Sequence, residues 1–195
     1  MSGTTTKRLK ILAFLAATTW ALGAQAAEIR PLIKAGFDVG GDTMVSVVFT
    51  NGDTEKVRAN EGFYLGGGAA ILDEARNMEY HVTLAYKFAL IDAENGDIEW
   101  TRIPLEALVF YRFPRARVGG GLTYHINPKL EGSGVVGGLD IEFKNALGLV
   151  LQADWLITRN IALGGRFTFL EYDAEGAFTG SAKSNGVGVT FSMNF

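Results

Sequence analysis

The feature that most constrains this chain is an alternation of apolar and polar residues with a period of two, which recurs in almost every segment after residue 30. In the stretch 80–90, Tyr80, Val82 and Leu84 begin one face, and His81 and Thr83 begin the other. Successive side chains point to opposite faces of a β-strand, whereas a helix repeats about every 3.6 residues. The pattern therefore predicts an all-β protein.

The alternation predicts eight antiparallel strands whose connections are alternately short and longer. The strands cover residues 33–49, 63–71, 80–90, 102–112, 117–125, 141–155, 161–169 and 186–195. The short connections are 73–77, 113–115 and 158–160, and those on the opposite side are 51–53, 92–97, 127–138 and 173–183. Short turns at one end and longer loops at the other are typical of a transmembrane up-and-down β-barrel with both termini in the periplasm.

The first hairpin is less regular than the others. Asn51-Gly52-Asp53 is a strong hairpin turn, and both arms are longer than the roughly 9–11 residues that span a membrane. We expect this hairpin to project beyond the membrane, with a bulge near Ala59 to Gly62. Residues 29–72 leave a count of ten strands open as an alternative to eight.

A soluble β-sandwich or a lipocalin-like barrel would also alternate. Two features favour a membrane barrel: opposite charges flanked by glycines on the polar face, and aromatic residues at strand ends, namely Tyr80, Tyr111, Tyr124, Trp155 and Phe195. Lipid offers no hydrogen bond to backbone groups, so the sheet must close. The last strand is therefore expected to pair with the first.

Residues 1–26 have the pattern of a cleaved signal peptide. Lys7, Arg8 and Lys10 are followed by an apolar run over 11–22 and by Ala24-Gln25-Ala26. The apolar run is shorter than the roughly 20 residues of a membrane-spanning helix. We expect export through this peptide, with residues 27–195 forming a barrel in the outer membrane.

Charge and cysteine content exclude several classes of function. Without residues 1–26, Lys plus Arg falls from 18 to 15 while Asp plus Glu stays at 21, a net charge of −6. This argues against nucleic acid as a partner, which requires a basic surface. The chain has no cysteine and 2 histidines, so the sequence predicts no disulfide, metal site or cofactor.

Polar residues on the inward face predict a plugged lumen. Eight strands leave room only for side chains inside, and buried charges must be paired. The predicted interior charge network comprises Lys34, Asp38, Lys87, Arg102, Glu106, Arg117, Asp154 and Arg166, with Gln152 beside it. The alternative is a narrow channel or small-solute carrier, which a larger strand count would favour.

The segment Gly186–Phe195 resembles the closing strand of bacterial outer-membrane proteins. Val189, Phe191, Met193 and Phe195 match the alternate positions that the barrel-assembly machinery reads in that family. Segments 117–124 and 162–167 also resemble strands of small OmpA/OmpX-type barrel domains. The resemblance implies a barrel surrounded by outer-membrane lipid and lipopolysaccharide, and it says little about activity.

Two further functions can be weighed from the sequence. Lipid A deacylases carry a histidine followed two positions later by serine on the lipid-facing side, but Thr83 follows His81 and Asn127 follows His125, and both histidines fall on the inward face. We therefore predict no catalysis, with a lipid A-modifying enzyme as the alternative. The loops 92–97, 127–138 and 173–183 are candidates for binding a surface ligand.

Overall fold

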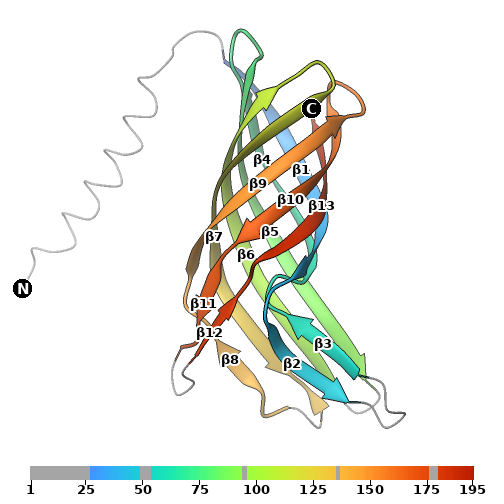
Figure 1. Cartoon of the computed structure of the whole chain (residues 1–195), viewed down its shortest axis with the longest axis vertical. Helices are drawn as coiled ribbons and strands as arrows, with labels where there is room; N and C mark the ends of the chain where they lie inside the picture. The colour runs from blue at the N-terminus through green and yellow to red at the C-terminus, as the bar shows by residue number, and fades with distance from the viewer. Residues whose placement is uncertain (1–26, 49–53, 94–95, 135–136, 176–179) are drawn as a thin grey trace, which may run out of the picture.

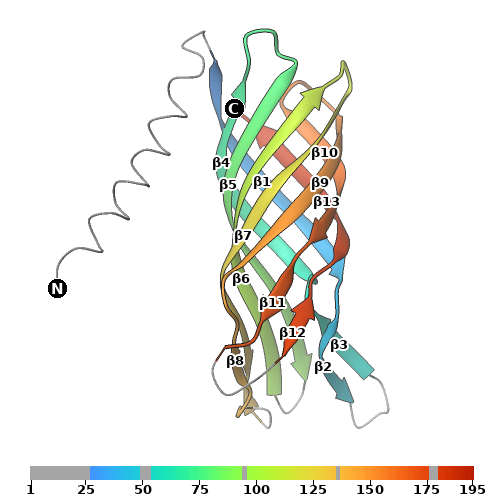
Figure 2. The same ribbon diagram turned by 60° about the vertical axis from the view of Figure 1, so that its left-hand side comes forward.

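Eight strands close into an antiparallel barrel in the computed structural model, which describes residues 27–48, 54–93, 96–134, 137–175 and 180–195 (Figures 1 and 2). The barrel strands are β1 (Glu28–Gly40), β4 (Gly62–Leu72), β5 (Met78–Ala93), β6 (Gly96–Arg112), β7 (Ala116–Gly132), β9 (Ala146–Leu156), β10 (Ile161–Phe169) and β13 (Gly186–Asn194). Each strand pairs with the next, and β13 pairs with β1. The predicted eight-stranded closed barrel is confirmed.

The two ends of the barrel differ in their connections. At the short-turn end, residues 73–77, 113–115 and 157–160 join successive strands, and β1 begins and β13 ends there. The opposite end, which we call the loop end, carries β5, β6 and β7 beyond the neighbouring strands (Figure 1). These three strands are 16, 17 and 17 residues long, well beyond the roughly 9–11 residues that cross a membrane.

Five short strands complete the loop end. The hairpin of β2 (Thr43–Val48) and β3 (Thr54–Arg58) pairs only within itself, as does that of β11 (Glu171–Asp173) and β12 (Ser181–Lys183). The fifth, β8 (Asp140–Glu142), extends the sheet from β7. The hairpin predicted to project thus leaves the wall, because Gly40 and Gly41 adopt φ values of 108° and 84°, a region that favours glycine. Two predictions, the signal peptide and the Asn51-Gly52-Asp53 turn, lie outside the described residues.

Several predicted boundaries were wrong at the loop end. The strand expected over 33–49 is broken between β1 and β2, and the expected loop 92–97 is mostly strand. β7 continues to Gly132, so the first half of the predicted loop 127–138 is strand and the loop is shorter than expected. The strand expected over 141–155 is divided into β8 and β9, and Phe143 between them faces inward and is buried rather than lying on the outer face.

Among the described residues, no helix is long and apolar enough to cross a bilayer.

The division at Phe143 follows from a bulge in the neighbouring strand. Asn127 of β7 has φ 49°, and the pairing of β6 with β7 shifts register beside it. An extra residue reverses which side chains point inward. Accordingly His125 is buried before the bulge and Leu130 after it. β8 pairs with β7 beyond the bulge and β9 pairs with it below, so the two cannot form one continuous strand.

Candidate functional site

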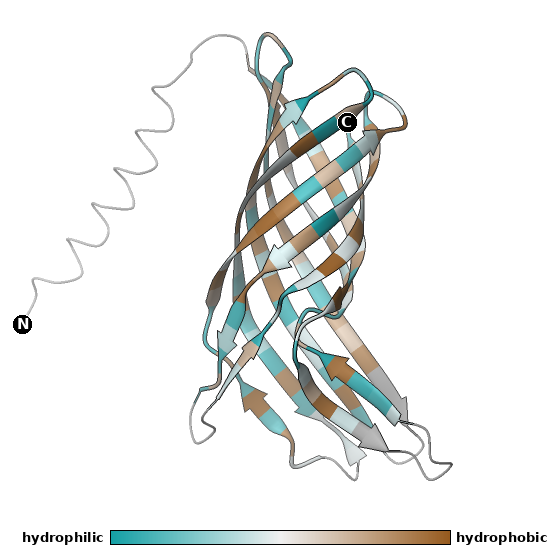
Figure 3. Cartoon of the chain, in the orientation of Figure 1, coloured by the Kyte–Doolittle hydropathy of each residue, from teal (hydrophilic) through white to brown (hydrophobic). Residues whose placement is uncertain are grey.

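An apolar belt surrounds the barrel on its outward face. Leu147, Phe63 and Trp155 are 64%, 58% and 57% exposed, and the same face continues on every barrel strand. Figure 3 shows the alternation of apolar and polar residues along the strands. Soluble monomers rarely expose apolar patches larger than a few hundred Å². The belt therefore needs an apolar environment around the protein.

The belt ends abruptly where β10 passes into β11. Within the belt, Phe167 and Phe169 point outward and are about half exposed, while Arg166 and Thr168 are buried inside. From Leu170 onward, the inward side chains are apolar and the outward ones are charged. Leu170 and Tyr172 are then buried inside, and the outward positions are Glu171 and Asp173, both exposed. Even-numbered residues are buried on both sides of this point, so the change is one of polarity and not of which side chains face inward. It indicates a change in the environment outside the barrel between Phe169 and Glu171.

Glu79 is the centre of the buried charge network nearest the short-turn end. Its carboxylate accepts hydrogen bonds from Arg112 Nη1 and Arg117 Nη1, both at 2.6 Å, and lies 2.8 Å from His81 Nε2. Arg117 Nε also donates to Asp154 Oδ2 at 2.7 Å. Two arginines thus face two carboxylates, which is the pairing that buried charges require.

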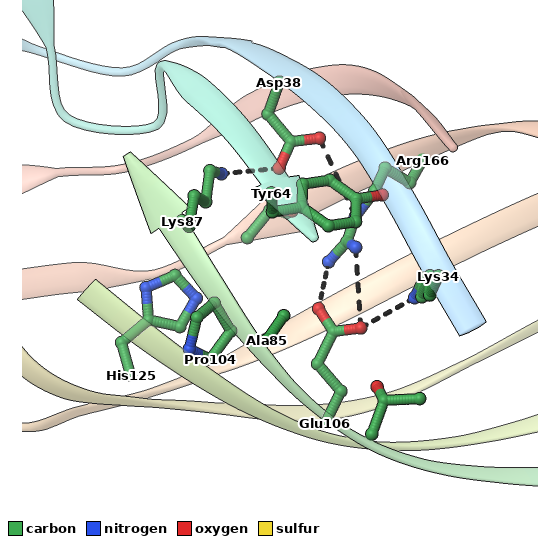
Figure 4. A pocket seen from close by; sticks show the side chains of 11 residues that line it. Lys34, Asp38, Tyr64, Ala85, Lys87, Pro104, Glu106, His125 and Arg166 are labelled. Carbon is green, nitrogen blue, oxygen red and sulfur yellow. Dashed lines mark hydrogen bonds and ion pairs between the residues drawn. The ribbon is translucent and has the colours of Figure 1, made fainter. Parts of the chain in front are cut away.

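A second network occupies the lumen towards the loop end (Figure 4). Lys34 Nζ donates to Glu106 Oε2 at 2.7 Å, and Arg166 donates to the other oxygen of the same carboxylate. Lys87 donates to Asp38, whose second oxygen lies 3.9 Å from Arg166 Nε. All five residues are at most 5% exposed. The network ties together strands β1, β5, β6 and β10.

Inward-facing glycines make room for these ion pairs. A Cβ at Gly188 would lie 1.8 Å from Asp38 Oδ1, and one at Gly164 would lie 1.9 Å from Asp154 Oδ1. Any larger residue would therefore displace a paired carboxylate. The glycines and the charged residues are complementary parts of one packed interior.

The loop end is closed by an apolar cluster rather than by ion pairs. Its buried members are Val57, Ala59, Ile98, Trp100, Leu130, Phe143, Ala146, Leu170 and Tyr172. The Trp100 ring meets the rings of Phe143 and Tyr172 edge-on, with centroids 5.4 and 5.3 Å apart, and Trp100 Nε1 donates to the Ala59 carbonyl at 3.0 Å. Burial raises the pKa of Tyr172 to about 12, so its hydroxyl stays protonated and hydrogen-bonds with His125 Nδ1. We call this cluster the apolar plug.

All eight charged residues predicted for the interior are buried, but they do not form one network. Arg117 and Asp154 belong to the Glu79 network, and five others form the second network. Arg102 belongs to neither. Its guanidinium lies 4.9 Å from the Trp100 ring centroid and donates to the backbone carbonyl of Glu61. It therefore joins the charged lumen to the apolar plug.

The second network leaves little space around its own side chains. The cavity that the second network encloses has a volume of about 10 Å³, which is room for one water molecule. His81 and His125 are 1% and 2% exposed and face the lumen. Within the described ranges, no three His, Asp or Glu side chains gather as they would around a metal ion.

Sequence reasoning missed Glu79 and the apolar plug. Glu79 lies one residue before the predicted strand 80–90, although it has the same parity as His81 and could have been assigned inward on that ground. The plug was missed because apolar residues were assigned to the outer face throughout. The segment 166–173, Arg-Phe-Thr-Phe-Leu-Glu-Tyr-Asp, carries the signal that could have found it, since its alternation changes phase after Phe169.

The fold is shared with small outer-membrane proteins of known structure. The chain is similar to Neisserial surface protein A, with a TM-score of 0.52 and 13% identity over 88% of this chain and 100% of that one. It is also similar to Ail, the attachment invasion locus protein of Yersinia pestis, with a TM-score of 0.53 and 11% identity over 87% of this chain and 99% of that one. No protein-family model and no curated protein sequence matches the chain. At these identities the likeness concerns the fold alone.

Proposed function

We propose that this chain is a non-catalytic outer-membrane protein that crosses the bilayer as a plugged barrel and presents its loop end as an interaction surface. The observation that carries the proposal is the reversal of polarity between Phe169 and Glu171. Acyl chains outside the barrel account for the apolar outer face below this point, and water accounts for the polar outer face above it. A soluble protein would have no reason for the change.

The proposed orientation places the short-turn end in the periplasm and the loop end outside the cell. Both the start of β1 and the end of β13 lie at the short-turn end, as in bacterial barrels of this topology. Export would use residues 1–26 as a signal peptide. The proposal includes a relation to OmpA/OmpX-type domains, which rests on the resemblance of segments 117–124 and 162–167 to strands of those domains.

Assembly would depend on the outward face of β13. Val189, Phe191 and Phe195 are 59%, 38% and 58% exposed, and Met193 shares their face. These side chains are available to the barrel-assembly machinery before lipid covers them. We expect Phe195→Ala to lower the amount of folded barrel in the outer membrane, measured by heat-modifiable gel migration, while Phe167→Ala, which removes an outward phenylalanine from the neighbouring strand β10, is the control. Equal amounts for wild type and Phe195→Ala would contradict this role.

The narrow space within the second network supports a structural or surface role over transport or catalysis. A cavity of about 10 Å³ is too small for a solute. Catalysis on lipid would require a nucleophile and its base where lipid can reach them, whereas His81 and His125 are enclosed. Single-channel steps in planar bilayers, or a change in lipid A acylation that His125→Ala abolishes, would overturn these two parts of the proposal.

The loop end provides the surface for a partner. The crystal structure of Ail contains a heparin analogue, a highly sulfated sugar, which makes surface saccharides one ligand class to test here. The described loop-end strands carry carboxylates such as Glu55, Glu131, Asp140 and Glu171. Two basic side chains of β3, Lys56 and Arg58, are exposed on the same side of the β2–β3 hairpin, so an anionic ligand would bind there.

Cysteine labelling tests the orientation, because the chain has no cysteine of its own. Glu55→Cys places a thiol on the exposed β2–β3 hairpin, and Glu74→Cys places one on an exposed short turn. A membrane-impermeant maleimide should label the first in intact cells, and the second only after the outer membrane is permeabilised. Labelling of position 74 but not 55 in intact cells would reverse the orientation, and labelling of neither in a permeabilised cell would contradict exposure of both ends.

A further inference from the structure

A groove lies between the β2–β3 hairpin and the outer wall of the barrel. It has a volume of about 630 Å³ and is open to the surroundings. Its floor contains Val39 and Val187, which pair across β1 and β13, and its other side is formed by Thr54, Lys56 and Arg58 of β3. Figures 1 and 2 show the hairpin standing away from the barrel wall on this side. The groove therefore joins an apolar surface to a basic one.

The hairpin presents its cations to the groove because its opposite face is committed to the apolar plug. Val57 of β3 is 2% exposed and belongs to the plug. Alternate residues point the other way, which leaves Lys56 and Arg58 exposed. Neither side chain forms an ion pair with a residue in the described part of the chain. Glu61 also lines the groove, and it accepts a hydrogen bond from the backbone N of Arg58 at 3.2 Å.

The groove lies at the upper edge of the apolar belt. Val39 and Val187 are 41% and 45% exposed. On the side towards the loop end they are followed by Gly40 and Gly186, the last residues that pair between β1 and β13. Below Val39 on the same face, Phe37 packs against Phe63, with ring centroids 4.5 Å apart, and Phe63 lies 6.4 Å from Phe88. Girdles of aromatic residues flank the apolar band of outer-membrane barrels at both interfaces. The two cations thus lie at the level of lipid headgroups.

We propose that this groove binds a phosphorylated glycolipid of the outer leaflet, lipopolysaccharide, through its lipid A phosphates. Lys56 and Arg58 would pair with a phosphate, because charge-assisted hydrogen bonds from these side chains are the strong ones. The acyl chains would lie on Val39, Val187 and the phenylalanine row beneath them. The inference rests on the proposed orientation, which brings the hairpin to the leaflet that contains this lipid.

Lipid binding by the refolded barrel in detergent micelles tests the site. Native mass spectrometry would compare lipid A carrying both phosphates, the same lipid A after phosphatase treatment, and phosphatidylglycerol. We expect Lys56→Gln/Arg58→Gln to weaken binding of phosphorylated lipid A about tenfold or more, since two charge-assisted contacts are lost. The matched control is Lys129→Gln/Lys144→Gln, which removes the same charge elsewhere at the loop end and should bind like wild type.

The outcomes separate this inference from the proposed function. Equal binding of dephosphorylated lipid A, equal binding of phosphatidylglycerol, or equal weakening by the control pair would overturn the groove as a glycolipid site. Failure of the wild type to give a heat-modifiable barrel in detergent would contradict the proposed function itself. A folded wild type that binds no lipid A would overturn the groove and leave the proposed function standing.

Discussion

The belt section and the loop end of this barrel are built from the same strands, but their interiors and exteriors are reversed. In the belt section, the lumen holds the charged networks and hydroxyl side chains together with a few apolar ones such as Phe110 and Val150, and the outer face is apolar. At the loop end, Trp100, Phe143 and Tyr172 form the core, and carboxylates such as Glu171 face outward. The comparison teaches that the surroundings, rather than the strand geometry, decide which face of a strand is apolar.

The two regions also differ in what holds them together. The lumen depends on paired charges, in which removing one partner leaves the other buried and uncompensated. The loop end depends on aromatic packing, which weakens locally when a ring is removed. A change in the lumen should therefore affect the whole barrel, whereas a change in the apolar plug should affect the loop end alone.

The largest effect is expected for Glu79→Ala. It removes the carboxylate that Arg112, Arg117 and His81 share and should lower the free energy of unfolding by about 3–5 kcal/mol. Urea unfolding in lipid vesicles, followed by the heat-modifiable gel shift, measures this. Glu142→Ala, an exposed glutamate of β8, is the control. Equal stability of the two variants would show that the Glu79 network does not hold the barrel.

Trp100→Ala should have a more local effect. Loss of the buried indole should weaken the loop-end core by about 3 kcal/mol and make the β11–β12 segment exchange its amide hydrogens faster. The belt section should still give the folded gel band, because its ion pairs are untouched. The control is Trp155→Ala, which removes an outward-facing ring of the belt. Complete unfolding of Trp100→Ala would contradict the division into two independently held regions.

Alanine substitutions at two adjacent glycines, Gly164 and Gly165, should give the smallest of these changes in stability. They compare an inward with an outward position of the same strand. A methyl group at Gly164 would meet Asp154 Oδ1 inside the barrel, whereas one at Gly165 would have its nearest neighbour at 3.9 Å. We expect Gly164→Ala to lower the free energy of unfolding by about 1–3 kcal/mol and Gly165→Ala to change it little, measured by the same urea titration. If both variants behave alike, the inward glycines do not serve to accommodate the carboxylates.

The sequence predicted the belt section well and the loop end poorly, for a physical reason. Alternation locates a strand and its two faces but does not say which solvent each face meets. Within the belt, assigning apolar residues outward put Arg117, Asp154 and Arg166 on the inward face, and all three are buried in the structure. Beyond the belt the same assignment put Phe143 outside. The division of the charges into two networks depends on distances across the lumen, which no local pattern contains.

A lysine scan along the outward face of β10 and β11 tests the reversal of polarity most directly. Lysine would replace Leu163, Phe167, Phe169, Glu171 and Asp173 in turn, and unfolding would be measured in lipid vesicles. The account predicts losses of about 2–4 kcal/mol at Leu163 and Phe167, a smaller loss at Phe169, and changes within about 0.5 kcal/mol at Glu171 and Asp173. A flat profile along the five positions, or its largest loss at Asp173, would contradict a membrane boundary between Phe169 and Glu171.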